Sequence, residues 1–175
     1  MIQLSEISQF RLDINKMSKI KPDERYTFSF VYHNTFDNNI NDLSKVIDFL
    51  HEDLVWDGIP TLDIVKQRLN FGSICMFWKY NNNVVGWSWL NNNNITTDWV
   101  TSHKPLNSNE QYGGGAFLHR KSKPEPLAGY KFYRLGIENM FESFDKSILY
   151  LYSDTWNRAS SILCNRVGFN KYNFL

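Results

Sequence analysis

The sequence predicts one domain of the α/β class in its α+β form, with strands and helices mixed along the chain. Residues 74–101 contain short apolar runs separated by turn residues, which is typical of a β meander. Residues 40–69 and 126–144 repeat apolar side chains at helical spacing. Residues 147–175 combine a strand, a short helix and a last strand. A chain of 175 residues is long enough for a single domain with its own core, so we expect residues 1–175 to form one domain.

The composition argues against several classes of function. The formal net charge is +1, so neither nucleic acid nor a membrane surface is the expected partner. No apolar stretch approaches the length of a transmembrane helix, and the first residues lack the apolar core of a signal peptide. The two cysteines, Cys75 and Cys164, are expected to be reduced thiols. These features predict a soluble, cytoplasmic protein.

Two strand candidates come first. Phe10–Ile14 and, more strongly, Tyr26–Tyr32 alternate apolar and polar side chains, as half-buried strands do. The sequence Lys21-Pro22-Asp23 between them is a turn signal.

Two helices are expected next. Asn39 or Asn41 can cap the first, and the sequence Asp57-Gly58-Ile59-Pro60 breaks it. Thr61 can then cap a second helix, Leu62–Leu69. The predicted inward residues are Ile40, Leu43, Val46, Ile47, Leu50 and Leu54 in the first helix, and Leu62, Val65 and Leu69 in the second.

The middle of the chain is predicted to be a meander. Ile74–Tyr80, Val84–Leu90 and Ile95–Thr101 are strand-like, and the asparagine tracts between them suit tight turns because Asn tolerates positive φ. Ser102–Gly115 is expected to be a long loop that ends in three glycines. A short strand, Ala116–His119, is expected to follow it.

The longest predicted helix is Pro126–Phe144, which a basic segment precedes. Pro126 suits the first helical turn, where its missing N–H costs nothing. The inward face consists of Tyr130, Tyr133, Ile137, Met140, Phe141 and Phe144.

The C-terminal residues predict a strand, a helix and a strand. Ile148–Tyr152 is a buried strand candidate, and Asp154 or Thr155 can cap the helix that follows. Gly168 supplies the left-handed residue that ends this helix, and Lys171–Leu175 is the last strand. The helix turns Ala159, Ile162, Leu163 and Val167 toward the core.

This last segment resembles the C-terminal motif of the GNAT superfamily of acyl-CoA-dependent N-acyltransferases. The family pattern is Asn, a small residue three positions later, Leu at six, often Tyr at seven, and Gly-Phe at eleven and twelve. The corresponding residues are Asn157, Ser160, Leu163, Cys164, Gly168 and Phe169, so only the Tyr position differs. The resemblance covers about residues 74–175. It implies the GNAT fold, a central mixed, mostly antiparallel, twisted sheet of six to seven strands flanked by about four helices. Since the family opens with a single strand, one N-terminal candidate is additional, and the sequence leaves open which.

The segment before the long helix partly resembles the family's pyrophosphate site, Gln/Arg-x-x-Gly-x-Gly/Ala. The aligned residues are Lys123, Pro126 and Ala128, of which Ala128 matches and Lys123 keeps a positive charge. Free N–H groups and the helix dipole attract an anion at such a helix start. Prolines 124 and 126 have no N–H to donate and Glu125 adds a negative charge, which Arg120, Lys121, Lys123 and Lys131 can offset. The implied acyl-CoA contacts are Leu118, His119, Arg120, Lys121, Lys123, Leu127, Ala128, Gly129, Tyr130 and Asn157.

The resemblance also implies a reaction, transfer of an acetyl or similar acyl group from acetyl-CoA or a relative to a primary amine. The thioester would lie where the strand ending near Leu118 and the strand Ile148–Tyr152 separate. Main-chain N–H near Leu118 or His119 would polarise its carbonyl. The candidate bases are Glu110, His119 and Asp98. Cys164 stands where many GNAT enzymes carry the Tyr that protonates the CoA thiolate, and water, Tyr150, Tyr152 or Tyr172 are the alternatives to it.

The acceptor and two other classes of function stay open at this point. The near-neutral charge favours a small-molecule amine. The resemblance implies that the first two helices and their loop line the acceptor side, so the possible contacts are His51, Glu52, Asp53, Trp56 and Asp57, unless these residues form a solvated loop. There are two alternatives to an enzyme. One is a domain that binds acyl-CoA or another anion without turnover, and the other is a protein-interaction domain. No metal is expected, since His33, His51, His103 and His119 show no ligand spacing. The chain is expected to be a monomer or homodimer.

Overall fold

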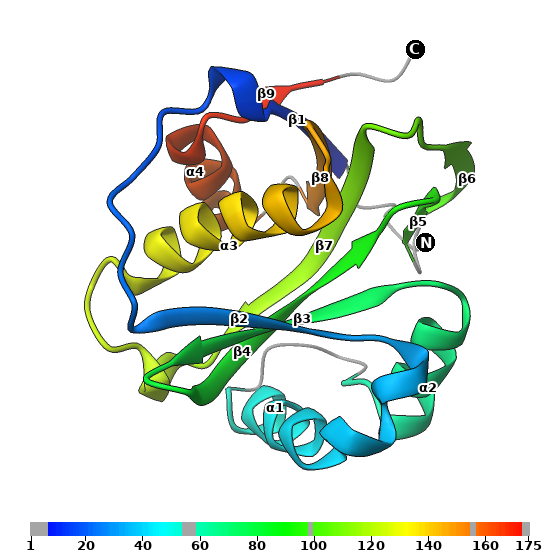
Figure 1. The fold of residues 1–175 in the computed structure, drawn as a ribbon, viewed down its shortest axis with the longest axis vertical. Coiled ribbons are helices and arrows are strands. Elements are labelled where there is room, and N and C mark those ends of the chain that lie inside the picture. Colours follow the sequence, from blue (N-terminus) through cyan, green and yellow to red (C-terminus); the bar gives the residue numbers. More distant parts are fainter. Residues whose placement is uncertain (1–6, 54–58, 98–99, 155–156, 173–175) are drawn as a thin grey trace, which may run out of the picture.

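The computed structural model describes residues 7–53, 59–97, 100–154 and 157–172. Its centre is a seven-stranded sheet in the order β2-β3-β4-β7-β8-β1-β9, with helices on both faces (Figure 1). The β7–β8 pair is parallel and the other pairs are antiparallel, so the predicted mixed, mostly antiparallel sheet is confirmed. The strands of this sheet are β1 (Ile7–Asp13), β2 (Tyr26–Val31), β3 (Ile74–Tyr80), β4 (Asn83–Asn91), β7 (Glu110–Leu118), β8 (Ile148–Asp154) and β9 (Asn170–Lys171).

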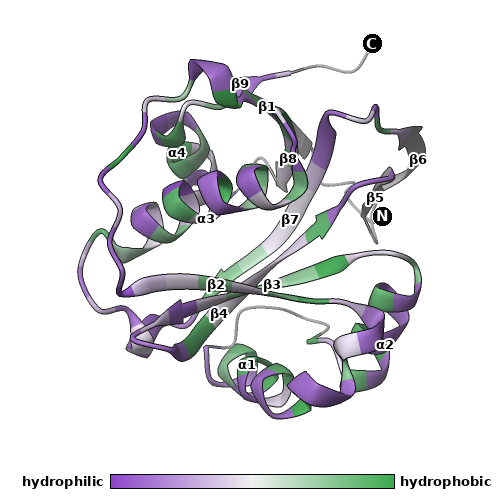
Figure 2. Ribbon diagram, in the orientation of Figure 1, coloured by the Kyte–Doolittle hydropathy of each residue, from purple (hydrophilic) through white to green (hydrophobic). Residues whose placement is uncertain are grey.

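The helices form one layer on each face of the sheet. The first face carries α3 (Ala128–Phe144) and α4 (Arg158–Val167), and the second carries α1 (Ile40–Glu52) and α2 (Leu62–Asn70) (Figure 1). Hydrophobic and hydrophilic stretches alternate along all four (Figure 2), as expected of helices with one buried stripe. A core therefore forms on each face, one around Phe132 and Met140 of α3 and one around Leu43 and Val46 of α1.

The two N-terminal strands lie far apart in the sheet. β2 pairs with β3 and opens the meander, whereas β1 lies between β8 and β9. β1 is therefore the additional strand. The chain between β1 and β2 runs along α3, where the buried Arg134 donates hydrogen bonds to the carbonyls of Ser18 and Val167.

The prediction for residues 95–115 was wrong in two places. The single strand Ile95–Thr101 is replaced by a separate hairpin of β5 (Asn94–Thr97) and β6 (Val100–Pro105). The predicted loop Ser102–Gly115 instead contains most of β7, which begins at Glu110. Three consecutive glycines are typical of a loop, but Gly113 lies in the sheet because its neighbours leave no room for a side chain. A Cβ there would come within 3.0 Å of Cδ2 of Leu151.

The boundaries of α3, α4 and the last strand differ slightly from the prediction. α3 begins at Ala128 rather than Pro126, and Asn157 rather than Asp154 caps α4, since its side chain accepts a hydrogen bond from Ser160 N at 3.1 Å. Thr155, the other candidate cap, lies outside the described residues. Gly168 ends α4 with φ +106°, as predicted. The last strand is Asn170–Lys171, and residues 173–175 of the predicted strand also lie outside the described part.

Two kinds of feature are absent from the described residues. No helix in this part of the chain has the length and apolar character needed to cross a membrane. No group of three or more His, Cys, Asp or Glu side chains in the same part is arranged to hold a metal ion.

Candidate functional site

The most distinctive feature of the sheet is a fork between its two parallel strands. β7 and β8 pair from Glu110 and Ile148 up to Gly113 and Leu151. Beyond this point β7 continues along β4 to Leu118, and β8 continues along β1 to Asp154. We call residues 113–118 of β7 and 151–154 of β8 the fork. Strands that part in this way leave backbone groups on their facing edges without a ladder partner. The resemblance to the GNAT superfamily implied this separation.

β7 is bulged within the fork. Its register against β4 shifts by one residue between the pairs Trp89–Gly114 and Trp87–Phe117, and Gly115 has φ +55°, which favours glycine. Beyond the bulge, His119 N–H donates to the Val85 carbonyl at 3.0 Å. Because N–H directions alternate along a strand, Leu118 N–H points away from β4, toward the open side of the fork. Of the two predicted backbone donors, the one at His119 is therefore occupied.

The basic loop, residues 119–127, connects the fork to α3. It begins with a short 3₁₀ turn, η4 (Arg120–Ser122). Arg120 N–H donates to Asp53 Oδ2 at 2.8 Å, and Lys121 Nζ donates to Glu52 Oε2 at 3.0 Å. The hydrogen bond from Lys121 lowers the pKa of Glu52. The loop is thus tied to the C-terminal end of α1.

The remaining charges of this loop are distributed unevenly. Glu125 accepts hydrogen bonds from Tyr26 OH at 2.5 Å and pairs with Lys131 Nζ at 2.6 Å, so its negative charge is largely balanced. Lys123 is exposed and forms no ion pair with any described residue. Among the predicted cationic contacts, Lys123 and the Arg120 guanidinium are the ones not engaged with a described carboxylate.

The first turn of α3 provides N–H groups that point toward this loop. Leu127 is the N-cap and makes no side-chain capping bond. Ala128 N–H donates to the Glu125 carbonyl at 3.0 Å, so it is occupied. Gly129 and Tyr130 follow in the first turn, where helix N–H groups lack intrahelical acceptors. The structure therefore brings most of the predicted cofactor-binding residues together, from Leu118 to Tyr130, with fewer free donors than the sequence suggested.

His119 lies between the basic loop and α1. Its side chain is 4% exposed and stacks on Phe49, with ring centroids 4.0 Å apart. Nδ1 lies 2.7 Å from Ser122 Oγ, and Nε2 lies 3.5 Å from Glu52 Oε2 and 3.9 Å from Asp53 Oδ1. This placement is that of a residue that positions the loop.

Glu110 is the first residue of β7, at the end of the paired β7–β8 segment that is away from the fork. Its side chain is 5% exposed and accepts hydrogen bonds from Tyr150 OH at 2.8 Å and Asn107 N–H at 2.9 Å. Burial and then the Glu110 carboxylate raise the pKa of Tyr150, so this phenol stays protonated. Tyr150 belongs to a cluster of tyrosines that also includes residues 112, 152 and 172.

The other predicted residues lie further from the fork or outside the described part. Cys164 is 2% exposed in the core beside α3, and burial raises its pKa to about 11. His51 is exposed at the end of α1. Trp56, Asp57 and Asp98 are not among the described residues.

Sequence reasoning missed Tyr112. This tyrosine lies on β7 where the fork begins. Burial raises the pKa of its phenol, and the charge of Arg68 on α2 offsets part of that rise. The only available signal was a tyrosine directly before three glycines, and this pattern carries no meaning until the strand is known.

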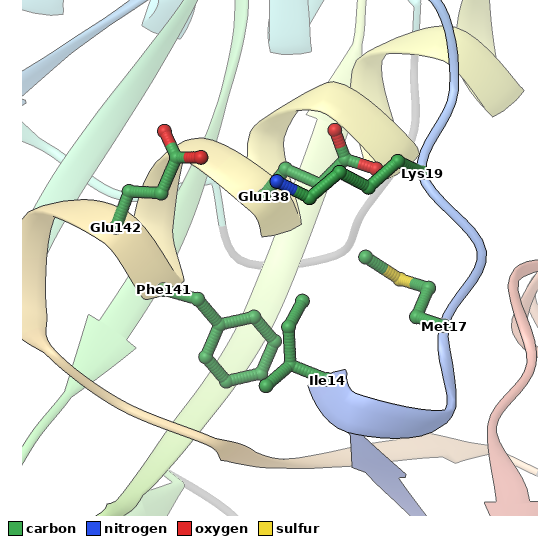
Figure 3. A pocket seen from close by; sticks show the side chains of 6 residues that line it. All are labelled: Ile14, Met17, Lys19, Glu138, Phe141 and Glu142. Carbon is green, nitrogen blue, oxygen red and sulfur yellow. The ribbon is translucent and has the colours of Figure 1, made fainter.

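Two hollows lie along α3. One of about 720 Å³ lies beside its first turns and is lined by Leu127, Tyr130, Lys131 and Leu135 together with residues 20–25. The other, of about 170 Å³, lies further along the helix, where Ile14, Met17 and Phe141 contribute apolar surface and Lys19, Glu138 and Glu142 contribute charges (Figure 3). Only the first adjoins the basic loop.

The comparisons with known proteins give a consistent answer at the level of structure. No protein-family model and no curated protein matches the sequence. A tandem GNAT protein from the clavulanic acid biosynthesis pathway superposes with a TM-score of 0.61 at 12% identity, over 97% of this chain and 51% of that one. This chain therefore spans about half of that protein.

Two further structures are matched over nearly their whole length. An aminoglycoside acetyltransferase from an uncultured soil metagenomic sample, in complex with sisomicin, has a TM-score of 0.55 at 11% identity, over 89% of this chain and 95% of that one. The ribosomal-protein-alanine N-acetyltransferase of Brucella melitensis biovar Abortus 2308 has a TM-score of 0.55 at 9% identity, over 86% of this chain and 95% of that one. The element order, the fork and these neighbours together show that the chain has the fold of the GNAT acetyltransferases.

Proposed function

We propose that the protein is an N-acyltransferase that moves an acetyl or similar acyl group from acyl-CoA to a primary amine. The observation that carries this proposal is the parallel β7–β8 fork, which leads through a basic loop into the first turn of α3. A fork provides room and backbone donors for a thioester, and a helix start beside basic side chains suits a diphosphate. Both lie on a fold whose similar structures include acetyltransferases.

The basic loop would hold the acyl-CoA phosphates. Lys123, Arg120 and the N–H groups of Gly129 and Tyr130 are the donors placed for this role, and Lys121 would exchange Glu52 for phosphate. Leu118 N–H would face the thioester carbonyl and stabilise the oxyanion of the tetrahedral intermediate. Asn157, through the amide nitrogen that its capping bond leaves unused, would contact the pantetheine.

The acceptor amine must be neutral when it attacks. Glu110 is preferred of the two described candidates for the base, because it accepts a hydrogen bond from Tyr150 of the tyrosine cluster, whereas His119 is packed between the loop and α1. Direct attack in a ternary complex would then form the amide.

We further propose a small-molecule acceptor and a cytoplasmic location. The near-neutral net charge and the similarity to an aminoglycoside acetyltransferase support a small amine. The similarity to an enzyme named for a ribosomal protein supplies the competing acceptor class. A panel of aminoglycosides, amino sugars and amino-acid derivatives, with N-terminal alanine peptides alongside, would decide between them. Faster acetylation of the peptides would contradict the small-molecule assignment.

A thermal-shift screen with acetyl-CoA, longer acyl-CoAs and free CoA tests the cofactor. Ligand at a hundred times its Kd should add about 2.7 kcal/mol to the free energy of unfolding. No shift with any of these ligands would contradict the proposal. A shift without transfer to any amine would favour the second candidate, a domain that binds acyl-CoA without turnover. Pro126 and Glu125 in the loop, and Cys164 at the Tyr position, are the observations that favour that candidate.

Replacing Lys121 and Lys123 with Glu tests whether the basic loop binds the acyl-CoA phosphates. Reversing two charges beside a diphosphate should weaken acetyl-CoA binding, and the loss should shrink as salt is raised. Calorimetry at two salt concentrations measures both effects. Exposed lysines 16 and 171, on η1 (Ile14–Lys16) and β9, give a control variant with the same change in net charge. Equal affinity of the two variants would exclude the basic loop as the site.

A further inference from the structure

We propose that Tyr112 is the catalytic acid that gives a proton to the departing CoA sulfur. This inference rests on the acyltransferase function proposed above. It assigns the role to a residue outside both sequence motifs.

Tyr112 is placed at the opening of the fork. It pairs with Tyr150 of β8, one position before the last β7–β8 pair, Gly113 and Leu151. Alternate residues of a strand share a face, so the Tyr112 side chain lies on the same face as Gly114. A Cβ at Gly114 would come within 2.9 Å of the Tyr112 hydroxyl oxygen and 3.4 Å of Cζ. The ring therefore lies along β7 over the glycine, and its hydroxyl reaches the point where the strands part.

The Tyr112 hydroxyl lacks a hydrogen-bond partner among the described residues, although the side chain is only 6% exposed. The buried tyrosines 26 and 150 differ in this respect, since they donate to Glu125 and Glu110. A group that arrives in the fork with a lone pair, such as a thioester or thiolate sulfur, would supply the missing acceptor.

The surroundings of Tyr112 suit an acid. Burial, and then Tyr152, raise the pKa of Tyr112 above its usual range, so it holds its proton at neutral pH. The Tyr152 ring, from the first β8 position beyond the paired segment, packs against it with centroids 5.5 Å apart. Arg68 of α2 lowers the pKa of Tyr112, which means that its guanidinium favours the phenolate formed when the proton leaves.

The proposed step transfers the acyl group from the CoA sulfur to the amine nitrogen. Amine attack forms the C–N bond and puts the thioester carbonyl electrons on oxygen. When these electrons return, the C–S bond breaks and the sulfur keeps the electron pair. The sulfur takes the proton of Tyr112, and the phenolate is reprotonated by the proton that the amine nitrogen gave to the base, passed through water. The products are the amide and the CoA thiol, with no other reactant.

This assignment differs from the one that the sequence motif implies. Cys164 holds the Tyr position of the motif, but its thiol lies in the core with Val167 and Met140. A thiol also offers little advantage over the chemically similar leaving group.

Tyr112→Phe tests the proposal because it keeps the ring over Gly114 and removes only the hydroxyl. We expect kcat to fall about 100-fold, with acetyl-CoA affinity unchanged. Tyr80→Phe is the control, since it removes a phenol on β3 that contacts Arg25. Unchanged kcat in Tyr112→Phe would overturn the proposal.

A second measurement is independent of the acceptor. Above the pKa of its thiol, CoA binds as the thiolate, which Tyr112 would stabilise by donating a hydrogen bond. Tyr112→Phe should then weaken CoA binding about tenfold at alkaline pH and leave desulfo-CoA, which has no sulfur, unaffected. Equal losses for both ligands would assign Tyr112 to general cofactor binding and overturn the acid role. If the wild-type protein bound neither ligand, the acyltransferase proposal would itself fail, which distinguishes the two.

Discussion

Cys164 shows that a residue can match a motif position and still belong to the core. It lies one turn before Val167 on the inward side of α4, and burial raises its pKa to about 11, so the thiol is protonated at neutral pH. Cysteine in such surroundings behaves as a small hydrophobic residue.

We therefore expect Cys164→Ala to lower stability by about 1 kcal/mol through the small cavity it leaves. The turnover number should stay within about twofold of the wild-type value, because Tyr112 retains its proton. Thermal unfolding and steady-state kinetics measure the two effects. A tenfold or larger loss of turnover in Cys164→Ala would return the acid role to the cysteine.

At the scale of elements, the basic loop combines an anion site with a carboxylate of its own. Glu125 is held by Lys131 and Tyr26, and the hydrogen bond from Lys131, followed by that from Tyr26, lowers the pKa of Glu125. The loop therefore carries this negative charge throughout the neutral pH range, beside the place proposed for phosphate.

Glu125→Gln should therefore increase acetyl-CoA affinity several-fold, on the order of threefold to tenfold, because Lys131 is released toward the phosphates. As pH falls through the lowered pKa of Glu125, the wild-type carboxyl loses its charge, and its affinity should approach that of the variant. Calorimetric titration across this range measures both. Weaker binding by Glu125→Gln would mean that the Glu125–Lys131 pair holds the loop in its binding shape instead.

Periodicity in the sequence predicted the helices, because each keeps one face in a core, whereas β3 and β4 were predicted from short apolar runs and are buried on both faces. The stripe through Leu43, Val46 and Leu50 lies inward in α1, and the Thr61 cap and the Gly168 stop lie as expected. The N-terminal half of β7 could not be predicted, since its glycines give no pattern and are fixed by contacts with Leu151 and Tyr112.

The site was partly predictable for a related reason. Motif spacing located the basic loop and α4, but the roles of individual residues depend on contacts across the fold. The link from Lys121 to Glu52 joins residues that are distant in the chain, and so does the hydrogen bond from Tyr26 to Glu125. A spacing pattern contains no information about such pairs.

For the whole molecule, the position of β1 is the most consequential feature. β1 pairs with β8 along its full length and with β9 at Phe10 and Arg11, although the next segment of chain leads to the opposite edge of the sheet. Phe10 and Leu12 are fully buried in the core beneath α3 and α4. The free edge of β8 in the fork therefore depends on a strand that the chain supplies from its N-terminal part.

Removing residues 1–13 should unfold the protein, because truncating a single buried Phe already costs about 3–5 kcal/mol and a domain is stable by only about 5–15 kcal/mol. A peptide of residues 1–16 added in trans should restore both the folded circular dichroism spectrum and acetyl-CoA binding, since it can pair with β8 and β9 without the connection to β2. The same peptide with Phe10→Asp is the matched control and should restore neither. Full acetyl-CoA binding by the truncated chain alone would show that β1 does not support the fork. Refolding by the peptide without recovery of binding would separate the fold from the site, and would place the cofactor elsewhere than between β7 and β8.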